Sequence, residues 1–304
     1  MRTKYIIRWT LLVVVLGAVA WELRRGVLAY RAERTTFYPP RGAVAMPPDS
    51  SSLGLTRVKF SSRDRTSLSG WYIQSRDSSA ILLAHGSDAN RSSLIDEARI
   101  LAQAGHGVLV FDFPGHGESA GQVNFGRSAT LAVEGAIDFL ATRPDVDSTR
   151  IGALGFSDGG VAVADAAATD ERIRAVALVA TPGDAERQTR DEYRRLGPIA
   201  VYGAMLPYRL RGVHLDSMRA IADVAAISPR PLAIFGGEED QVVPEDEAKA
   251  LFAASRAPHQ LFIVAHGNHG EYAERDTAYA REVQGFFAAG LTRGATANLR
   301  IIRR

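Results

Sequence analysis

Three side chains in this sequence could together carry out nucleophilic catalysis: Ser157, Asp240 and His269. A serine hydroxyl is a poor nucleophile at neutral pH, so it needs a histidine base and a carboxylate that orients the histidine. Ser157 lies in Gly155-Phe-Ser-Asp-Gly159, where the glycines permit a sharp turn from a strand into a helix. The helix N-terminus would favour negative charge at the exposed hydroxyl. Because one such motif can arise by chance in a glycine-rich chain, the assignment depends on the remaining sequence.

The acid and the base follow the last two apolar runs of the chain. Leu232–Phe235 is followed by Gly-Gly-Glu-Glu-Asp240, and Gln260–Val264 is followed by Ala-His-Gly-Asn-His269. Open α/β sheets bind ligands outside the carboxyl ends of their strands, so polar residues there are candidates for a site. The resulting chain order is serine, acid, histidine, which differs from the orders in chymotrypsin and subtilisin.

Neighbouring residues compete for two of these roles. His266 is the alternative base, but it stands at the strand end, whereas the glycine-rich loop of His269 can bring an imidazole back over the serine. Asp184 is the alternative acid if the favoured aspartate points away. Two further acids are interpreted as solvated turn residues: Glu238 and Glu239.

Apolar runs and amphipathic segments alternate from residue 56 onward. The predicted strands are Thr56–Phe60, Leu68–Ile73, Ala80–Ala84, Gly107–Phe111, Ile151–Leu154, Ile173–Ala180, Leu232–Phe235 and Gln260–Val264. The predicted helices are Leu94–Ala104, Thr130–Thr142, the segment after Ser157, Asp246–Ala254 and Tyr279–Ala289. This alternation predicts an α/β fold with a mostly parallel sheet covered on both faces, and the first two strands form an antiparallel edge.

With these elements in place, the sequence resembles the α/β-hydrolase superfamily, in particular its membrane-anchored members of the serine aminopeptidase and monoglyceride-lipase type. Four segments between residues 56 and 290 carry the resemblance: Leu83–Asn90, Asp112–Ser119, Gly155–Gly160, and Gly237–Pro244 with Gly267-Asn-His269. The resemblance implies Ser157 as nucleophile, Asp240 as triad acid and His269 as base. It also implies an oxyanion hole formed by the backbone N–H groups of Ser87 and Asp158.

Two positions depart from the family pattern. Asp158 stands beside the nucleophile, where a carboxylate facing the site would disfavour a negative oxyanion, so we predict that its side chain points to solvent. Ser87 replaces a common asparagine, but the implied donor is a backbone group. His85 and His116 lie in glycine-rich turns and are interpreted as structural hydrogen-bonding residues rather than bases.

Residues 1–30 differ from the rest of the chain. Arg2, Lys4 and Arg8 precede the uncharged run Trp9–Trp21, which is shorter than the about 20 apolar residues of a membrane span. It reaches spanning length if Tyr5–Ile7 join it and the Arg8 side chain extends to the headgroups, and we then predict a single membrane anchor. The alternative is an exported protein with a cleaved signal peptide, because Ala18-Val-Ala20 has the small-x-small form of a cleavage site. Basic residues flank the run on both sides, so its orientation is not fixed.

Four further segments complete the predicted organisation. Residues 31–55 contain two Pro-Pro pairs and are predicted to be a linker, followed by a hydrolase domain over 56–292. Within it the alternation stops at about 182–228, which we predict to be a small cap insertion over the carboxyl edge of the sheet; a packed helical excursion is the alternative. Residues 293–304 are predicted to be a basic tail.

These observations predict a serine hydrolase that cleaves a carboxylic ester or thioester through an acyl-enzyme on Ser157. An acyltransferase, an amidase or peptidase, and a non-catalytic membrane scaffold on a hydrolase fold are the alternatives. The formal charge of +2 is too small to indicate a nucleic-acid partner, and the absence of cysteine excludes disulfides and thiolate catalysis. We expect a small-molecule acyl substrate and neither a metal nor an organic cofactor, because the reaction requires none.

Overall fold

A computed structural model describes residues 2–270, 272–275 and 277–292. The chain divides into two compact units: residues 1–37 with 186–214, and residues 38–185 with 215–304. The larger unit contains the sheet, and the smaller unit contains helices only in its described part. The predicted basic tail over 293–304 lies outside the described residues.

The larger unit is built on one sheet of eight strands in the order β1-β2-β4-β3-β5-β6-β7-β8. The strands are β1 Thr56–Ser61, β2 Ser67–Ile73, β3 Ala80–Ala84, β4 Gly107–Phe111, β5 Ile151–Phe156, β6 Ile173–Val179, β7 Leu232–Gly237 and β8 His259–Val264. Strand β2 pairs antiparallel with β1 and with β4, and all later pairs are parallel. The predicted mostly parallel sheet and its antiparallel edge are therefore confirmed.

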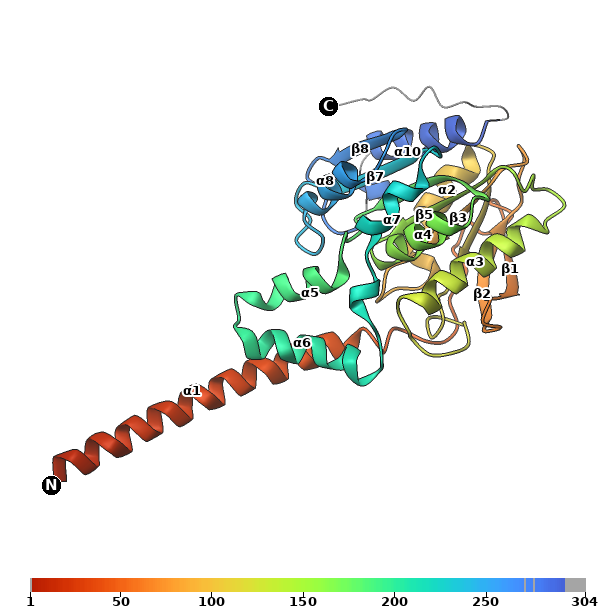
Figure 1. The fold of residues 1–304 in the computed structure, drawn as a ribbon. Coiled ribbons are helices and arrows are strands. Elements are labelled where there is room, and N and C mark those ends of the chain that lie inside the picture. The colour runs from red at the N-terminus through yellow and green to blue at the C-terminus, as the bar shows by residue number, and fades with distance from the viewer. Residues whose placement is uncertain (1, 271, 276, 293–304) are drawn as a thin grey trace. The chain divides into compact units, whose positions relative to one another are not determined.

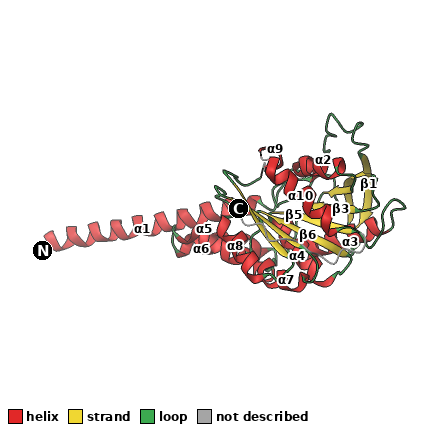
Figure 2. Cartoon of the chain, turned by 90° about the horizontal axis from the view of Figure 1, so that it is seen from above, coloured by secondary structure: helices red, strands yellow, loops and turns green. Residues whose placement is uncertain are grey.

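Helices cover both faces of this sheet (Figure 2). One face carries α2 Ile95–Gln103, α9 Tyr272–Arg275 and α10 Thr277–Gly290. The other face carries α3 Arg127–Ala141, α4 Asp158–Thr169, α7 Ala220–Ile227 and α8 Glu245–Ala254. Two short 3₁₀ helices are η1 Arg91–Leu94 and η2 Leu215–Ser217. Every residue of β3 and β4 is buried, because these strands pack against helices on both sides.

The smaller unit pairs the N-terminal helix with part of the insertion. Its helices are α1 Arg2–Thr35, α5 Ala185–Arg194 and α6 Pro198–Leu210. Helix α6 runs alongside the C-terminal half of α1 (Figure 1), while Tyr5–Trp21 is exposed along its whole length. By length and composition, α1 is the one described helix that could cross a membrane; its most apolar stretch of 18 residues has a mean hydropathy of 1.9.

The insertion predicted at about 182–228 is shared between the two units. Residues 186–214 group with α1, whereas η2 and α7 belong to the larger unit, where α7 packs against α4 and α8. The segment predicted as a linker begins inside α1, which ends at Thr35, four residues before Pro39. A cap role for the insertion stays a prediction.

Candidate active site

Ser157 occupies a tight turn between β5 and α4. Its backbone has φ 54° and ψ −126°, a conformation that costs a non-glycine residue about 1–3 kcal/mol. The neighbouring glycines are required by space: a Cβ at Gly155 would lie 2.4 Å from the Cα of Gly160, and one at Gly159 would lie 2.3 Å from the Ala84 carbonyl oxygen. The turn therefore holds the serine at the carboxyl end of β5, as its sequence predicted.

His269 connects the serine to a buried carboxylate. Its Nε2 lies 3.2 Å from the Ser157 Oγ, and its Nδ1 lies 2.9 Å from the Asp240 Oδ2. Because a carboxylate can only accept, Nδ1 carries the proton and donates it to Asp240, which leaves Nε2 free to accept the serine hydroxyl. The Phe156 ring packs against the imidazole at a centroid distance of 4.9 Å. The structure thus brings the three sequence-predicted residues into one hydrogen-bonded chain.

The Asp240 carboxylate is fixed on both of its oxygens. Its Oδ1 accepts the backbone N–H groups of Val242 and Val243, each at 2.8 Å. Its Oδ2 accepts the hydroxyl of Tyr272 at 3.3 Å in addition to the imidazole. Burial and the nearby carboxylate both raise the pKa of the Tyr272 phenol, so it remains a neutral donor. The role of Tyr272 could not be predicted from the sequence, because nothing in the residues around it distinguishes it from a core aromatic residue.

The loop after β3 lies directly against the serine. A Cβ at Gly86 would stand 3.1 Å from the Ser157 Cβ, and the residue that follows is Ser87. His116 holds this loop, because its Nε2 lies 2.6 Å from the Ser87 carbonyl oxygen. His85 holds it from within: its Nδ1 contacts the Gly86 carbonyl oxygen at 2.6 Å. Both histidines therefore make the structural hydrogen bonds that their glycine-rich turns suggested.

His85 is neutral in the folded protein. The Phe113 N–H donates to its Nε2 at 3.1 Å, so the proton resides on Nδ1. Complete burial lowers the pKa of His85 to about 3. The loop after β3 is tied to the loop after β4 a second time by the buried ion pair of Arg91 with Asp112, in which the Arg91 N–H also donates to the Asp112 Oδ1 at 2.8 Å.

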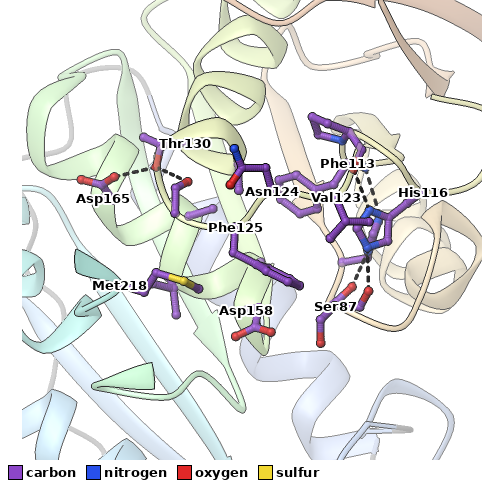
Figure 3. Close-up of a pocket in the computed structure, with 18 of the residues that line it drawn as sticks. Ser87, Phe113, His116, Val123, Asn124, Phe125, Thr130, Asp158, Asp165 and Met218 are labelled. Carbon is purple, nitrogen blue, oxygen red and sulfur yellow. Dashed lines mark hydrogen bonds between the residues drawn. The ribbon is translucent and has the colours of Figure 1, made fainter. Parts of the chain in front are cut away.

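A pocket is lined at one end by Ser87 and Asp158 (Figure 3) and by Gly86, which lies against the Ser157 side chain. Most of its wall is apolar, formed by Phe113, Val123, Phe125, Ala129, Val161 and Met218. Farther along the wall, the Thr130 hydroxyl donates to the Asp165 Oδ2 at 2.5 Å. Such a wall suits the apolar portion of a small substrate, with polar groups concentrated at one end.

The side chain of Asp158 corrects one prediction. Its carboxyl group lines this pocket and interacts with the Ser87 side chain instead of pointing to solvent. Burial raises the pKa of Asp158, and the nearby Asp88 raises it further. The physical reason lies in the turn: Asp158 is the first residue of α4, and the loop of Ser87 closes over that end of the helix.

The competing residues point elsewhere. His266 is exposed, and its Nδ1 hydrogen-bonds the Glu239 Oε1 at 2.8 Å. Glu238 accepts the His266 backbone N–H at 3.0 Å, so these turn acids are exposed but partnered. Asp184 forms an ion pair with Arg219 at 3.0 Å. Within the described residues, no three His, Asp or Glu side chains are grouped as metal ligands.

Comparisons with known proteins concern the family and the fold. The family model described as serine aminopeptidase, S33, matches residues 75–202. Protein Rv2307c of Mycobacterium tuberculosis (strain H37Rv) is 30% identical over 262 residues, covering 84% of this chain and 87% of that protein. Protein YfhR of Escherichia coli (strain K12) is 28% identical over 243 residues, covering 77% and 78%.

Among solved structures, the Pyrococcus furiosus esterase Pf2001 superposes with a TM-score of 0.67 at 20% identity, covering 84% of this chain and 98% of that one. At that identity the likeness shows the fold, and it extends over nearly the whole esterase. The sheet, the turn at Ser157 and these relatives lead to the same assignment. The chain belongs to the α/β-hydrolase superfamily.

Proposed function

We propose that this protein is a serine hydrolase that cleaves a carboxylic ester or thioester through an acyl-enzyme on Ser157, tethered to a membrane by α1. The observation that carries the proposal is the relay from the Ser157 Oγ through His269 to the buried Asp240, with contacts of 3.2 and 2.9 Å. Amides are less readily cleaved by the same residues, because an amine leaves less easily than an alkoxide or a thiolate.

In this mechanism His269 takes the hydroxyl proton on Nε2 as the Ser157 Oγ attacks the acyl carbonyl carbon. The resulting imidazolium is stabilised by Asp240, and the tetrahedral oxyanion by the backbone N–H groups of Ser87 and Asp158. The imidazolium then protonates the departing alcohol or thiol as its bond to carbon breaks. Water, deprotonated by the same Nε2, attacks the acyl-enzyme and releases the carboxylic acid. The imidazole proton returns to the Ser157 oxygen.

The pocket supports an acyl or alcohol portion of mainly apolar character. It begins at the two residues whose backbone N–H groups are proposed to bind the oxyanion, and its wall is dominated by aromatic and aliphatic side chains. A substrate carbonyl at Ser157 could therefore place one apolar branch between Phe113 and Met218.

The test is labelling of the full chain with a fluorophosphonate probe, together with turnover of p-nitrophenyl esters, acyl-CoA thioesters and p-nitroanilides. We expect labelling that disappears in Ser157→Ala and persists in the matched surface variant Ser93→Ala. Esters or thioesters should be cleaved faster than anilides. A folded wild-type protein that neither reacts with the probe nor cleaves any of these substrates would reject the proposal.

The proposal of a membrane tether rests on α1. Its segment Tyr5–Thr35 is long enough and contains a sufficiently apolar stretch to span a membrane, and that stretch is not buried in the protein. The same segment is compatible with a signal peptide. N-terminal sequencing of the mature protein separates the two. A start near Met1 supports the anchor, whereas a start at Trp21 shows cleavage after Ala20 and export without an anchor.

A further inference from the structure

Apolar side chains are exposed around the first turns of α6, which packs against α1, the helix that is proposed to cross the membrane. Leu196 and Tyr202 are 42% and 57% exposed, and Ile199 between them is 37% exposed. In α6 itself, Ile199, Tyr202, Leu206 and Leu210 follow at spacings of three and four residues, which places them on one face of the helix. An exposed apolar stripe of this kind calls for a partner.

Helix α6 is held to α1 by small residues that permit close backbone approach. A Cβ at Gly203 would lie only 2.1 Å from the Gly26 carbonyl oxygen. Ala29 on α1 and Ala200 and Ala204 on α6 are buried around this crossing. Small residues at helix crossings are typical of helices that pack within or next to membranes. This close contact fixes the position of α6 along the axis of α1.

Hydrogen bonds to α1 show where each end of α6 lies along the axis of α1. The Arg25 Nη1 donates to the Leu196 carbonyl oxygen at 3.0 Å, and the same guanidinium lies 5.6 Å from the Trp21 ring, so the start of α6 lies within about one turn of Trp21. At the other end, the Tyr208 hydroxyl donates to the Glu33 Oε2 at 2.7 Å. The two helices therefore run in the same direction. With a rise of about 1.5 Å per residue, Leu210 stands roughly 20 Å farther along the α1 axis than Leu196.

The proposed span places the membrane surface at the start of α6. Tyr5–Trp21 would extend for about 26 Å as a helix, close to the roughly 30 Å thickness of the hydrocarbon core. Trp21 then lies at the interface, where tryptophan is enriched. The guanidinium groups of Arg24 and Arg25 lie 5.5 and 5.6 Å from its ring, at headgroup level.

A second pair of arginines, Arg194 and Arg195, directly precedes Leu196. Arg194 ends α5 and Arg195 follows it in the connection to α6. Both are exposed, and among the described residues the Arg194 guanidinium has a long contact of 3.6 Å to the exposed Asp191. Clusters of arginine next to a span are attracted to anionic lipid headgroups. Apolar side chains that enter the interface and arginines beside them are the combination found in helices that bind membrane surfaces.

We propose that the end of α5, its connection to α6 and the first turns of α6, through Arg194, Arg195, Leu196, Ile199 and Tyr202, bind the anionic headgroup region of the bilayer that α1 spans. The proposal rests on the membrane tether in the proposed function, and it concerns a different element from the catalytic residues. It makes the insertion a second point of contact with lipid, so that the bilayer fixes both helices of the smaller unit.

The test uses the absence of cysteine from the chain. Full-length Leu196→Cys, Tyr202→Cys and Leu210→Cys are labelled with the environment-sensitive dye NBD and reconstituted in vesicles of phosphatidylcholine and phosphatidylglycerol. Some vesicles carry nitroxide lipids labelled at the headgroup. Leu210 is the matched control, since it lies on the same face of α6 and is 67% exposed. Val14→Cys, with nitroxides in the acyl chains, reports the span.

We expect headgroup nitroxides to quench NBD most at Leu196→Cys, less at Tyr202→Cys and least at Leu210→Cys. Replacing phosphatidylglycerol by phosphatidylcholine, or substituting both Arg194→Gln and Arg195→Gln, should lower the quenching at position 196. Equal quenching at positions 196 and 210 would overturn the proposal. So would energy transfer between two labelled copies at position 196 without quenching by lipid, which indicates a second copy as the occupant.

The Val14→Cys label separates this proposal from the tether. Quenching there without quenching at position 196 overturns the contact of α6 and leaves the anchor intact, whereas no quenching at position 14 overturns both. Fluorophosphonate labelling of each variant reports the serine site separately. Thermal unfolding of each labelled variant shows whether it is folded, and the two positions 196 and 202 provide independent reporters should one of them fold poorly.

Discussion

Asp240→Asn provides the sharpest test of the catalytic relay, because the structure dictates which way the new amide must face. The Asp240 Oδ1 accepts two backbone N–H groups, from Val242 and Val243, at 2.8 Å each. An amide NH₂ cannot accept, so the Asn oxygen must occupy this position and the NH₂ must face His269. That NH₂ donates to Nδ1 and forces the imidazole proton onto Nε2, where it can no longer accept the Ser157 hydroxyl.

The magnitude follows from two losses. Restoring the productive tautomer would set two donors against each other at the 2.9 Å contact, at a cost of about 1–3 kcal/mol. The imidazolium formed during the reaction also loses the carboxylate charge, which is worth about 4 kcal/mol at a charge separation of about 4 Å and an effective dielectric constant of about 20. Together these losses amount to roughly 5–7 kcal/mol, or a decrease in kcat/KM of about 10⁴- to 10⁵-fold.

The assay is kcat/KM for a p-nitrophenyl ester, measured on Asp240→Asn beside the wild type. Because the substitution is isosteric and keeps both backbone hydrogen bonds, the circular dichroism spectrum and Tm should change little. Asp184→Asn is the matched control: it neutralises the alternative acid, which pairs with Arg219, and should leave turnover near the wild-type value. The reasoning is refuted if Asp240→Asn keeps more than about a tenth of the wild-type kcat/KM, a change of only 1.4 kcal/mol.

Three further predictions concern the groups around the relay. Tyr272→Phe removes one hydrogen bond to Asp240, so kcat should fall about 3- to 10-fold with KM unchanged, and a fall beyond a hundredfold would contradict a positioning role. Gly160→Ala places a Cβ 1.9 Å from the Thr181 Oγ1, so urea unfolding should show a loss of about 1–3 kcal/mol; unchanged stability would mean that the turn relaxes. The pKa of His85 is about 3 in the folded protein and 6.5 in the unfolded chain, so below pH 6.5 the unfolded chain binds a proton that the folded protein does not. The free energy of unfolding should therefore fall as the pH is lowered through 6.5, by roughly 2 kcal/mol at pH 5. Unfolding of His85→Asn should depend less on pH over that range, and parallel curves for variant and wild type would contradict the assignment.

The sequence could indicate the three candidate residues because each follows an apolar run: Ser157 directly, Asp240 and His269 within a few residues. A strand buried on both faces leaves a continuous apolar signature, as in β5, and the residue after it is carried to the carboxyl edge of the sheet. Ser157 is the residue directly after β5, whereas Asp240 and His269 lie in the loops that follow β7 and β8. The strand order could not be read from the same signature, because β3 and β4 are equally apolar and nothing local shows that β4 lies next to β2.

The sequence did not predict where two functional side chains point. Asp158 was predicted to face solvent, yet its carboxyl group lines the pocket because the Ser87 loop closes over the start of α4. The contact joins residues 71 positions apart, so no local pattern contains it. Tyr272 is a similar case: its hydroxyl reaches Asp240 only because both elements pack at the same edge of the sheet. In both residues the functional contact is tertiary, whereas the sequence signal was confined to short segments.

The contact between α1 and α6 could not be predicted from the sequence for a different reason. Helix contacts are usually recognised from a stripe of large apolar residues, but here the crossing is made by Gly26 and Gly203, which contribute no apolar side chain. Ile199, Tyr202 and Leu210 lie on the exposed side of α6, whereas Met205 and Tyr208 are buried, so the large apolar residues of this helix do not form one buried stripe. Because the close approach depends on both glycines, the N-terminal helix is a structural partner of the insertion as well as a candidate anchor. Deleting α1 to obtain a soluble protein would therefore expose the small-residue face of α6 along with its apolar stripe, and substrate preferences measured after such a deletion would describe a protein with an altered insertion.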